Sequence, residues 1–182
     1  MKRDLLGGEE VNVYSHKEGV VRAVVCAGLY PNIAKLKSAA TKGSPPSFLD
    51  EEGSIDLHPS SVAFQAERFR TSWVVYHEKV KTTKVYLRDS CSISPFAVIL
   101  FGGKLSVDHQ GGTIAIDSWI KFAMSPKDAV RLKRLRHELD SILLDVVKTP
   151  NVLPPSAQTS VDATAVILDK EWERICKQKG VA

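Results

Sequence analysis

Hydrophobic and polar residues alternate between Trp73 and Asp89, which predicts a β-hairpin with its turn near Thr82 and Thr83. Side chains two positions apart share one face of a strand. One face of the first strand carries Trp73, Val75, His77, Lys79 and Lys81, and the other carries Val74, Tyr76, Glu78, Val80 and Thr82. Hydrophobic residues begin the strand and cations lie near the turn, so we expect one end in a core and the other in solvent.

The same alternation predicts further short strands at 33–37, 54–58, 105–108 and 113–122. The segment 39–53 contains prolines, glycines and an acidic run, which predicts a loop between strands. Gly111 and Gly112 predict the turn that joins the last two strands.

Apolar residues spaced three to four positions apart predict helices on both sides of the strands. One helix covers about 19–29 and a short one covers 96–101, with Ser94 as its N-cap and Pro95 at its first position. A third begins after Ser125, which is expected to cap it, and a last one covers about 163–177. The third helix has an apolar stripe of Leu132, Leu135, Leu139, Ile142 and Val146, and its opposite side carries Arg131, Arg134, Arg136 and His137.

This order of elements predicts a mostly β fold with flanking helices, in the form of an OB-fold-like antiparallel barrel of five or six strands. In that arrangement the small helix at 96–101 precedes the last pair of barrel strands. The pattern alone leaves other small barrels open.

Composition is that of a globular protein, since 43% of the 182 residues are hydrophobic and 25% are charged. A net charge of +4 is compatible with nucleic acid without requiring it. The three cysteines are far apart, which disfavours a disulfide framework or a zinc cluster. With neither a signal peptide nor an apolar run long enough to span a membrane, we expect the cytoplasm or the nucleus and no membrane partner.

Motifs for catalysis are incomplete. Gly102, Gly103 and Lys104 resemble the end of a phosphate loop, but the preceding glycine and the following hydroxyl are missing. The pair His77 and Glu78 lacks the second histidine of a zinc protease. His58 and Ser60 lack a third orienting group. We therefore expect no catalytic residue, no metal site and no cofactor in this chain.

The cationic end of the hairpin suggests a binding surface. Lysines there can neutralise phosphates, and Thr82 and Thr83 can donate hydrogen bonds to phosphate oxygens. Tyr76, Tyr86 and Trp73 offer faces on which bases could stack, although we expect Trp73 in the core. The simpler interpretation is an ordinary solvated strand tip, because exposed lysines also prevent edge-to-edge pairing of strands.

Four separated segments share their order and spacing with one known family. They are Val21–Ala34, Leu57–Ser61, Trp73–Thr82, and Ser94–Phe96 with Leu100–Gly103. In these segments the chain resembles the C-terminal region of DEAH-box/RNA helicase A-type ATP-dependent RNA helicases, over roughly residues 19–145. Unlike a whole helicase, it contains no phosphate loop and no Asp-Glu-Ala-His motif.

The sequence pattern and the resemblance together predict a division of the chain into five parts. These are a flexible segment at 1–18, the end of a preceding helical region at 19–31, an OB-fold at 32–124, an amphipathic helix at 125–148, and a proline-containing linker with a terminal helix at 149–182. Apolar surface on the helix at 21–29 is then expected to pack on the parent's ATPase lobes.

The resemblance also implies an auxiliary domain that binds single-stranded RNA or DNA and helps to regulate unwinding. Together with the cationic hairpin, it suggests nine RNA-binding residues: His58, Ser60, His77, Lys79, Lys81, Thr82, Thr83, Lys84 and Arg88. ATP and Mg²⁺ would serve the parent helicase, and the other partners would be its ATPase lobes and an accessory protein. The alternative is a protein-interaction module that docks on those lobes or on an accessory partner.

Overall fold

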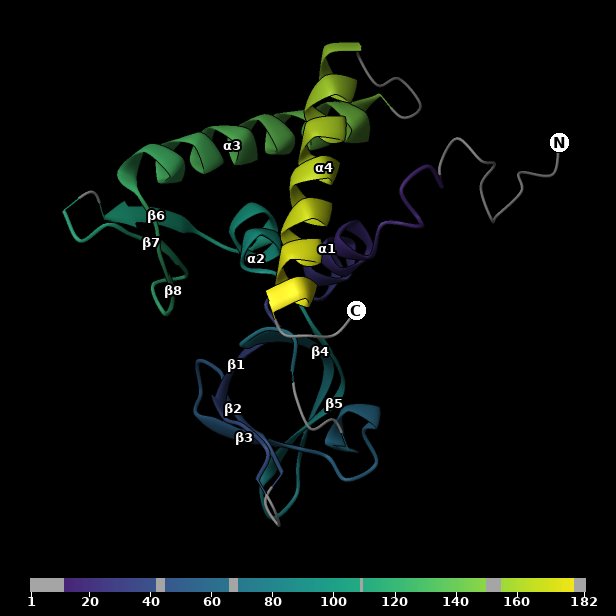
Figure 1. The fold of residues 1–182 in the computed structure, drawn as a ribbon, viewed down its shortest axis with the longest axis vertical. Helices are drawn as coiled ribbons and strands as arrows, with labels where there is room; N and C mark the ends of the chain where they lie inside the picture. The colour runs from purple at the N-terminus through teal and green to yellow at the C-terminus, as the bar shows by residue number, and fades with distance from the viewer. Residues whose placement is uncertain (1–11, 42–44, 66–68, 109, 150–154, 179–182) are drawn as a thin grey trace, which may run out of the picture.

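The strands form two separate sheets, and helices pack above and beside them (Figure 1). The computed structural model describes residues 12–41, 45–65, 69–108, 110–149 and 155–178. Most of the N-terminal segment and most of the linker expected before the last helix lie outside these ranges, as does His109.

The first sheet is a closed barrel in the strand order β1-β2-β3-β5-β4, with β4 pairing back onto β1. β3 and β5 run parallel and the other neighbours run antiparallel. The strands are β1 (Ile33–Ser38), β2 (Ser47–Leu49), β3 (Ser54–Leu57), β4 (Trp73–Lys81) and β5 (Val85–Ser92). The predicted OB-fold-like barrel is therefore confirmed, with five strands.

Several details of the predicted topology were wrong. β2 lies inside the segment 39–53, which was expected to be only a loop. The last strands do not join the barrel: β6 (Leu105–Asp108), β7 (Thr113–Ile116) and β8 (Ile120–Ala123) form their own sheet. The barrel closes without them because β4 reaches both β1 and β5. The short helix that precedes the last two barrel strands is η2 (Val62–Gln65), whereas α2 (Pro95–Phe101) follows the barrel.

The expected strand at 113–122 is two strands, because the chain turns between Ile116 and Ile120. Asp117 and Ser118 have φ angles of 46° and 68°. These left-handed conformations reverse the chain, so β7 and β8 pair with each other.

The longer helices are α1 (Glu18–Leu29), α3 (Pro126–Lys148) and α4 (Pro155–Gln178). The capping predictions are confirmed: Ser94 accepts a hydrogen bond from the N–H of Ala97, and Ser125 accepts one from the N–H of Asp128. α4 begins earlier than the predicted 163. None of the helices in the described ranges is long and apolar enough to cross a membrane.

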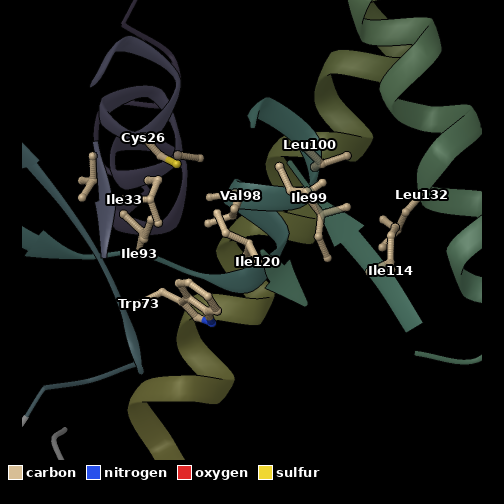
Figure 2. Packing of buried hydrophobic residues seen from close by; sticks show 14 of the residues in the cluster. Cys26, Ile33, Trp73, Ile93, Val98, Ile99, Leu100, Ile114, Ile120 and Leu132 are labelled. Carbon is tan, nitrogen blue, oxygen red and sulfur yellow. The ribbon is translucent and has the colours of Figure 1, made fainter. Parts of the chain in front are cut away.

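Two cores share strand β4, whose first four residues are buried on both faces. Val74 and Tyr76 pack inside the barrel, with Phe48 and Leu87 among their neighbours. Trp73 and Val75 belong instead to a core between the barrel, α1, α2 and the second sheet (Figure 2). The Trp73 ring lies 5.3 Å from that of Phe122 and 6.0 Å from that of Trp119. Trp73 is therefore a core residue as expected, but it lies outside the barrel.

The prediction that Arg136 lies on the solvent side of α3 was wrong. The residue was assigned to the solvent side, yet its side chain is only 17% exposed. Its guanidinium donates to the carbonyls of Ile99 at 3.0 Å and Gly103 at 2.6 Å, and also to that of Gly102. These carbonyls lie at the C-terminal end of α2, where a cation offsets the helix dipole.

Candidate nucleic-acid interface

The predicted hairpin is formed by β4 and β5, which pair from Val74 and Ser92 to Lys81 and Val85. The N–H of Thr82 donates to the carbonyl of Lys84 at 2.8 Å and closes the turn. β4 pairs with β1 only through Trp73, Val74 and Val75. The second half of the hairpin therefore extends past β1, away from the helices (Figure 1).

The tip of this hairpin consists of Lys81, Thr82, Thr83 and Lys84, all of which are exposed. Among the described residues Lys81 has no ion-pair partner within 4.0 Å. The Lys84 side chain is 67% exposed. The tip thus places two lysine side chains and two hydroxyl groups at an exposed surface, a set that suits contacts with a phosphate backbone.

Lys79 is held to the side of the tip by the turn between β2 and β3. Its ammonium lies 2.5 Å from Oδ2 of Asp50 and 2.8 Å from Oε2 of Glu52. Burial alone would lower the pKa of Lys79, but the hydrogen bonds to Asp50 and Glu52 outweigh it and raise that pKa above the usual 10.5. Lys79 is therefore charged and already neutralised by carboxylates.

Lys84 has a similar partner on β3. Its ammonium lies 3.0 Å from Oδ2 of Asp56, and this hydrogen bond raises the pKa of Lys84. The Asp56 side chain is 27% exposed. Of the three lysines expected to contact RNA, Lys79 and Lys84 thus form ion pairs with carboxylates of the β2–β3 hairpin.

The predicted residues His58, Ser60 and Arg88 form a second group, at the end of β3. Nδ1 of His58 lies 2.6 Å from the hydroxyl of Ser60 and accepts from the N–H of Ser60 at 3.1 Å. The Arg88 guanidinium lies 3.4 Å from Nε2 of His58 and 3.6 Å from a carboxylate oxygen of Glu78. These residues contact one another and Glu78, and none of these described residues is hydrogen-bonded or ion-paired to the tip of the hairpin.

His77 is exposed on β4, and its carbonyl accepts a hydrogen bond of 3.4 Å from the side chain of Asn32. Lys79, two residues further on, lines a cavity of about 490 Å³ between the barrel and the second sheet. Tyr30, Tyr76, Trp119 and Asp117 also line it, together with the acidic turn. The structure therefore divides most of the predicted site residues among the tip, the cavity and the end of β3, and leaves His77 exposed on β4 outside these three groups.

The carboxylates of Asp50, Glu52 and Asp56 were missed as parts of the site. The available signal was the charge of the segment 47–57, which contains four acidic residues and no Lys or Arg. In the barrel order β2 and β3 lie between β1 and β5. The acidic β2–β3 hairpin therefore lies close to the cationic β4–β5 hairpin.

Comparison with known families covers both parts of the structure. The family model described as the oligonucleotide/oligosaccharide-binding (OB)-fold matches residues 21–105, which include the whole barrel. A second model, described as the C-terminal domain in RNA helicases, matches residues 112–160. The chain belongs to the family of OB-fold C-terminal regions of DEAH-box RNA helicases.

Members of this family with curated names align over most of the chain. Human "ATP-dependent DNA/RNA helicase DHX36" is 36% identical over 146 residues, which is 78% of this chain and 14% of the relative. "DExH-box ATP-dependent RNA helicase DExH4, chloroplastic" of Arabidopsis thaliana is 38% identical, over 76% of this chain and 10% of the relative.

Mouse "Putative ATP-dependent RNA helicase DHX57" is 35% identical over 169 residues, which is 80% of this chain and 12% of the relative. The chain therefore spans only a small part of the length of the relatives it matches. These alignments confirm the resemblance that the four segments indicated.

Proposed function

We propose that this chain acts as an auxiliary domain of an ATP-dependent RNA helicase, binds single-stranded RNA or DNA at the tip of the β4–β5 hairpin, and helps to regulate unwinding. The observation that carries the proposal is the exposed group of Lys81, Thr82, Thr83 and Lys84, which projects from the barrel of an OB-fold. The names of the relatives as RNA helicases support the choice of nucleic acid as ligand.

The chain itself is proposed to hydrolyse no ATP, and ATP with Mg²⁺ would act in the ATPase core of a parent helicase. The proposed place of action is the cytoplasm, the nucleus, or both. His77, Lys79 and Arg88, with His58 and Ser60, would flank the path of the strand rather than make its first contact, because the tip lies at the end of the hairpin that extends past β1.

The test is a salt titration with a labelled single-stranded oligouridylate. A lysine that neutralises a phosphate of a single strand contributes roughly 0.7 to the slope of log Kobs against log salt concentration. We expect Lys81→Ala to weaken binding and to flatten this slope by about that amount. Lys170→Ala is the control, because Lys170 is exposed on α4 and does not belong to the tip.

The proposal fails if a variant with Lys79, Lys81 and Lys84 all changed to Ala binds the oligonucleotide as tightly as the wild type. Amide chemical shifts recorded in the same titration identify the place of binding. Changes confined to residues outside the β4–β5 hairpin would also contradict the proposal.

Protein docking is the second candidate function, and a separate observation favours it. Val21 and Val24 of α1 are 44% and 63% exposed, and they line a cavity of about 310 Å³. Exposed apolar residues that adjoin one another are typical of contact surfaces. The test is a pull-down with helicase ATPase lobes in the absence of RNA. Retention that is lost with Val24→Asp, together with no oligonucleotide binding, would favour this function.

A further inference from the structure

The β2–β3 hairpin is acidic, whereas the neighbouring β4–β5 hairpin carries more basic than acidic residues. Asp50, Glu51 and Glu52 form its turn, and Asp56 lies on β3. The segment 47–57 has no basic residue. Because β3 pairs directly with β5 through Asp56 and Tyr86, the two hairpins lie side by side at the end of the barrel.

The carboxylate of Asp50 is held in the orientation that contacts Lys79 by hydrogen bonds within its own turn. Its Oδ1 accepts hydrogen bonds from the N–H groups of Glu52 and Gly53, at 2.9 and 3.0 Å. These bonds fix the carboxylate, so that Oδ2 points to the ammonium of Lys79. The Asp50 side chain is 6% exposed, whereas that of Glu52 is 83% exposed. One partner of Lys79 is therefore fixed and buried, and the other is adaptable.

We propose that the β2–β3 hairpin is an internal competitor of nucleic acid, in which Asp50, Glu52 and Asp56 hold Lys79 and Lys84 in the place of phosphate groups. The proposal rests on the proposed function, since it concerns the same lysines. A carboxylate and a phosphate oxygen make the same charge-assisted hydrogen bond to an ammonium group. A bound strand must therefore displace the carboxylates or leave these lysines unused.

The three lysines are then recruited in a definite order. Lys81 has no competing carboxylate among the described residues and makes the first contact. Lys84 follows, because its side chain is 67% exposed and ion pairs made by exposed lysines are weak. Lys79 comes last, since it must leave two carboxylates, one of them buried. The competitor thus sets how many phosphates the tip engages.

The experiment compares Glu52→Gln with Glu51→Gln in binding to a labelled 12-nucleotide oligouridylate. Each variant removes one exposed negative charge from the same turn, but only Glu52 is paired with Lys79. We expect Glu52→Gln to tighten binding roughly two- to fivefold more than Glu51→Gln at low salt, the range that corresponds to an exposed ion pair. Asp56→Asn is expected to have a similar effect through Lys84.

A second pair of variants tests whether the effect passes through Lys79. In a Lys79→Ala background, Glu52→Gln and Glu51→Gln should tighten binding equally, because no competed lysine remains. If the two substitutions are equal in the wild-type background, or if their difference persists without Lys79, the competitor is ruled out while binding at the tip stands. If the wild type binds no oligonucleotide, the proposed function and the competitor both fall.

Discussion

The ammonium of Lys79 lies 2.5 Å from Oδ2 of Asp50, a carboxylate whose side chain is 6% exposed. Removing the lysine would leave this carboxylate buried without its cation. We therefore expect Lys79→Met to lower the free energy of unfolding by about 1–2 kcal/mol in urea denaturation. Lys81→Met is the control, because Lys81 is exposed and has no ion-pair partner among the described residues. Equal losses in the two variants would contradict this prediction.

The same pair has a defined pH dependence. The pKa of Lys79 is raised in the folded protein: burial acts to lower it, but the hydrogen bonds to Asp50 and Glu52 prevail. Its contribution to stability is therefore complete below the ordinary pKa of 10.5 and is lost as the pH rises through the folded value. We expect the difference in Tm between the wild type and Lys79→Met to be constant from pH 7 to 9 and to shrink above 10.5. If the Tm difference between the wild type and Lys79→Met grows at high pH, the stabilising pair of Lys79 with Asp50 and Glu52 is contradicted.

The barrel could be predicted from sequence because local patterns specify most of its strands. Alternation around Trp73 and Asp89 predicted the longest hairpin, and Ser94 with Pro95 predicted the start of α2. β2 could not be found in this way, since three residues are too few to show a period. The pairing of strands also could not be read locally, and so the second sheet was wrongly joined to the barrel.

The geometry of the candidate site could be predicted only in part, for a related reason. Positive charge near Thr82 was visible in the sequence, and the structure places Lys81 and Lys84 at an exposed tip. What neutralises Lys79 and Lys84 depends on contacts between residues about 27–29 positions apart. Such contacts follow from the barrel order, which no local pattern reveals.

Glu171 on α4 is expected to destabilise the protein when it is ionised. It is 6% exposed, and its Oε2 atom has no hydrogen-bond partner among the described residues. Burial raises the pKa of Glu171, although contacts with Ser94, Phe96 and Arg174 partly oppose this effect. A raised folded pKa means that stability is greatest below the ordinary value of 4.5 and falls as the pH rises through the folded value.

We therefore expect Glu171→Gln to raise stability by about 1 kcal/mol at pH 7, with a gain that disappears in acid. Tm measured at several pH values from 4 to 8 tests this. Glu173→Gln is the matched control, since Glu173 is an exposed neighbour on the same helix and its loss should change Tm little. A lower Tm for Glu171→Gln at pH 7 would show that the ionised group is stabilising.

Two glycines of α1 should respond to alanine in opposite ways. A Cβ atom at Gly19 would lie 2.5 Å from the carbonyl oxygen of Leu168 and 2.9 Å from Cα of Asp169, both in the backbone of α4. Gly19→Ala must push the two helices apart, at a cost of about 2 kcal/mol. At Gly28 nothing lies within 4 Å, so Gly28→Ala should stabilise the helix by about 0.5–1 kcal/mol.

Urea denaturation of the two glycine variants provides the comparison, and each variant is the control for the other. Helix propensity alone would stabilise both. A gain at Gly19 similar to that at Gly28 would therefore show that α1 and α4 are not in close backbone contact.

Among the basic residues of α3, Arg136 is expected to be the one whose substitution lowers the stability of the protein most. Its guanidinium binds three carbonyls at the end of α2, and the Nε atom also lies 3.9 Å from Asp140. Lysine keeps the charge but cannot present the same planar fork of donors. Arg136→Lys should lower the free energy of unfolding by about 2 kcal/mol, because buried carbonyls lose their donors.

Arg134→Lys, at an exposed position on the same helix, should change the free energy of unfolding by less than about 0.5 kcal/mol. Similar values for both variants would mean that charge alone, rather than the fork of hydrogen bonds, joins α3 to α2.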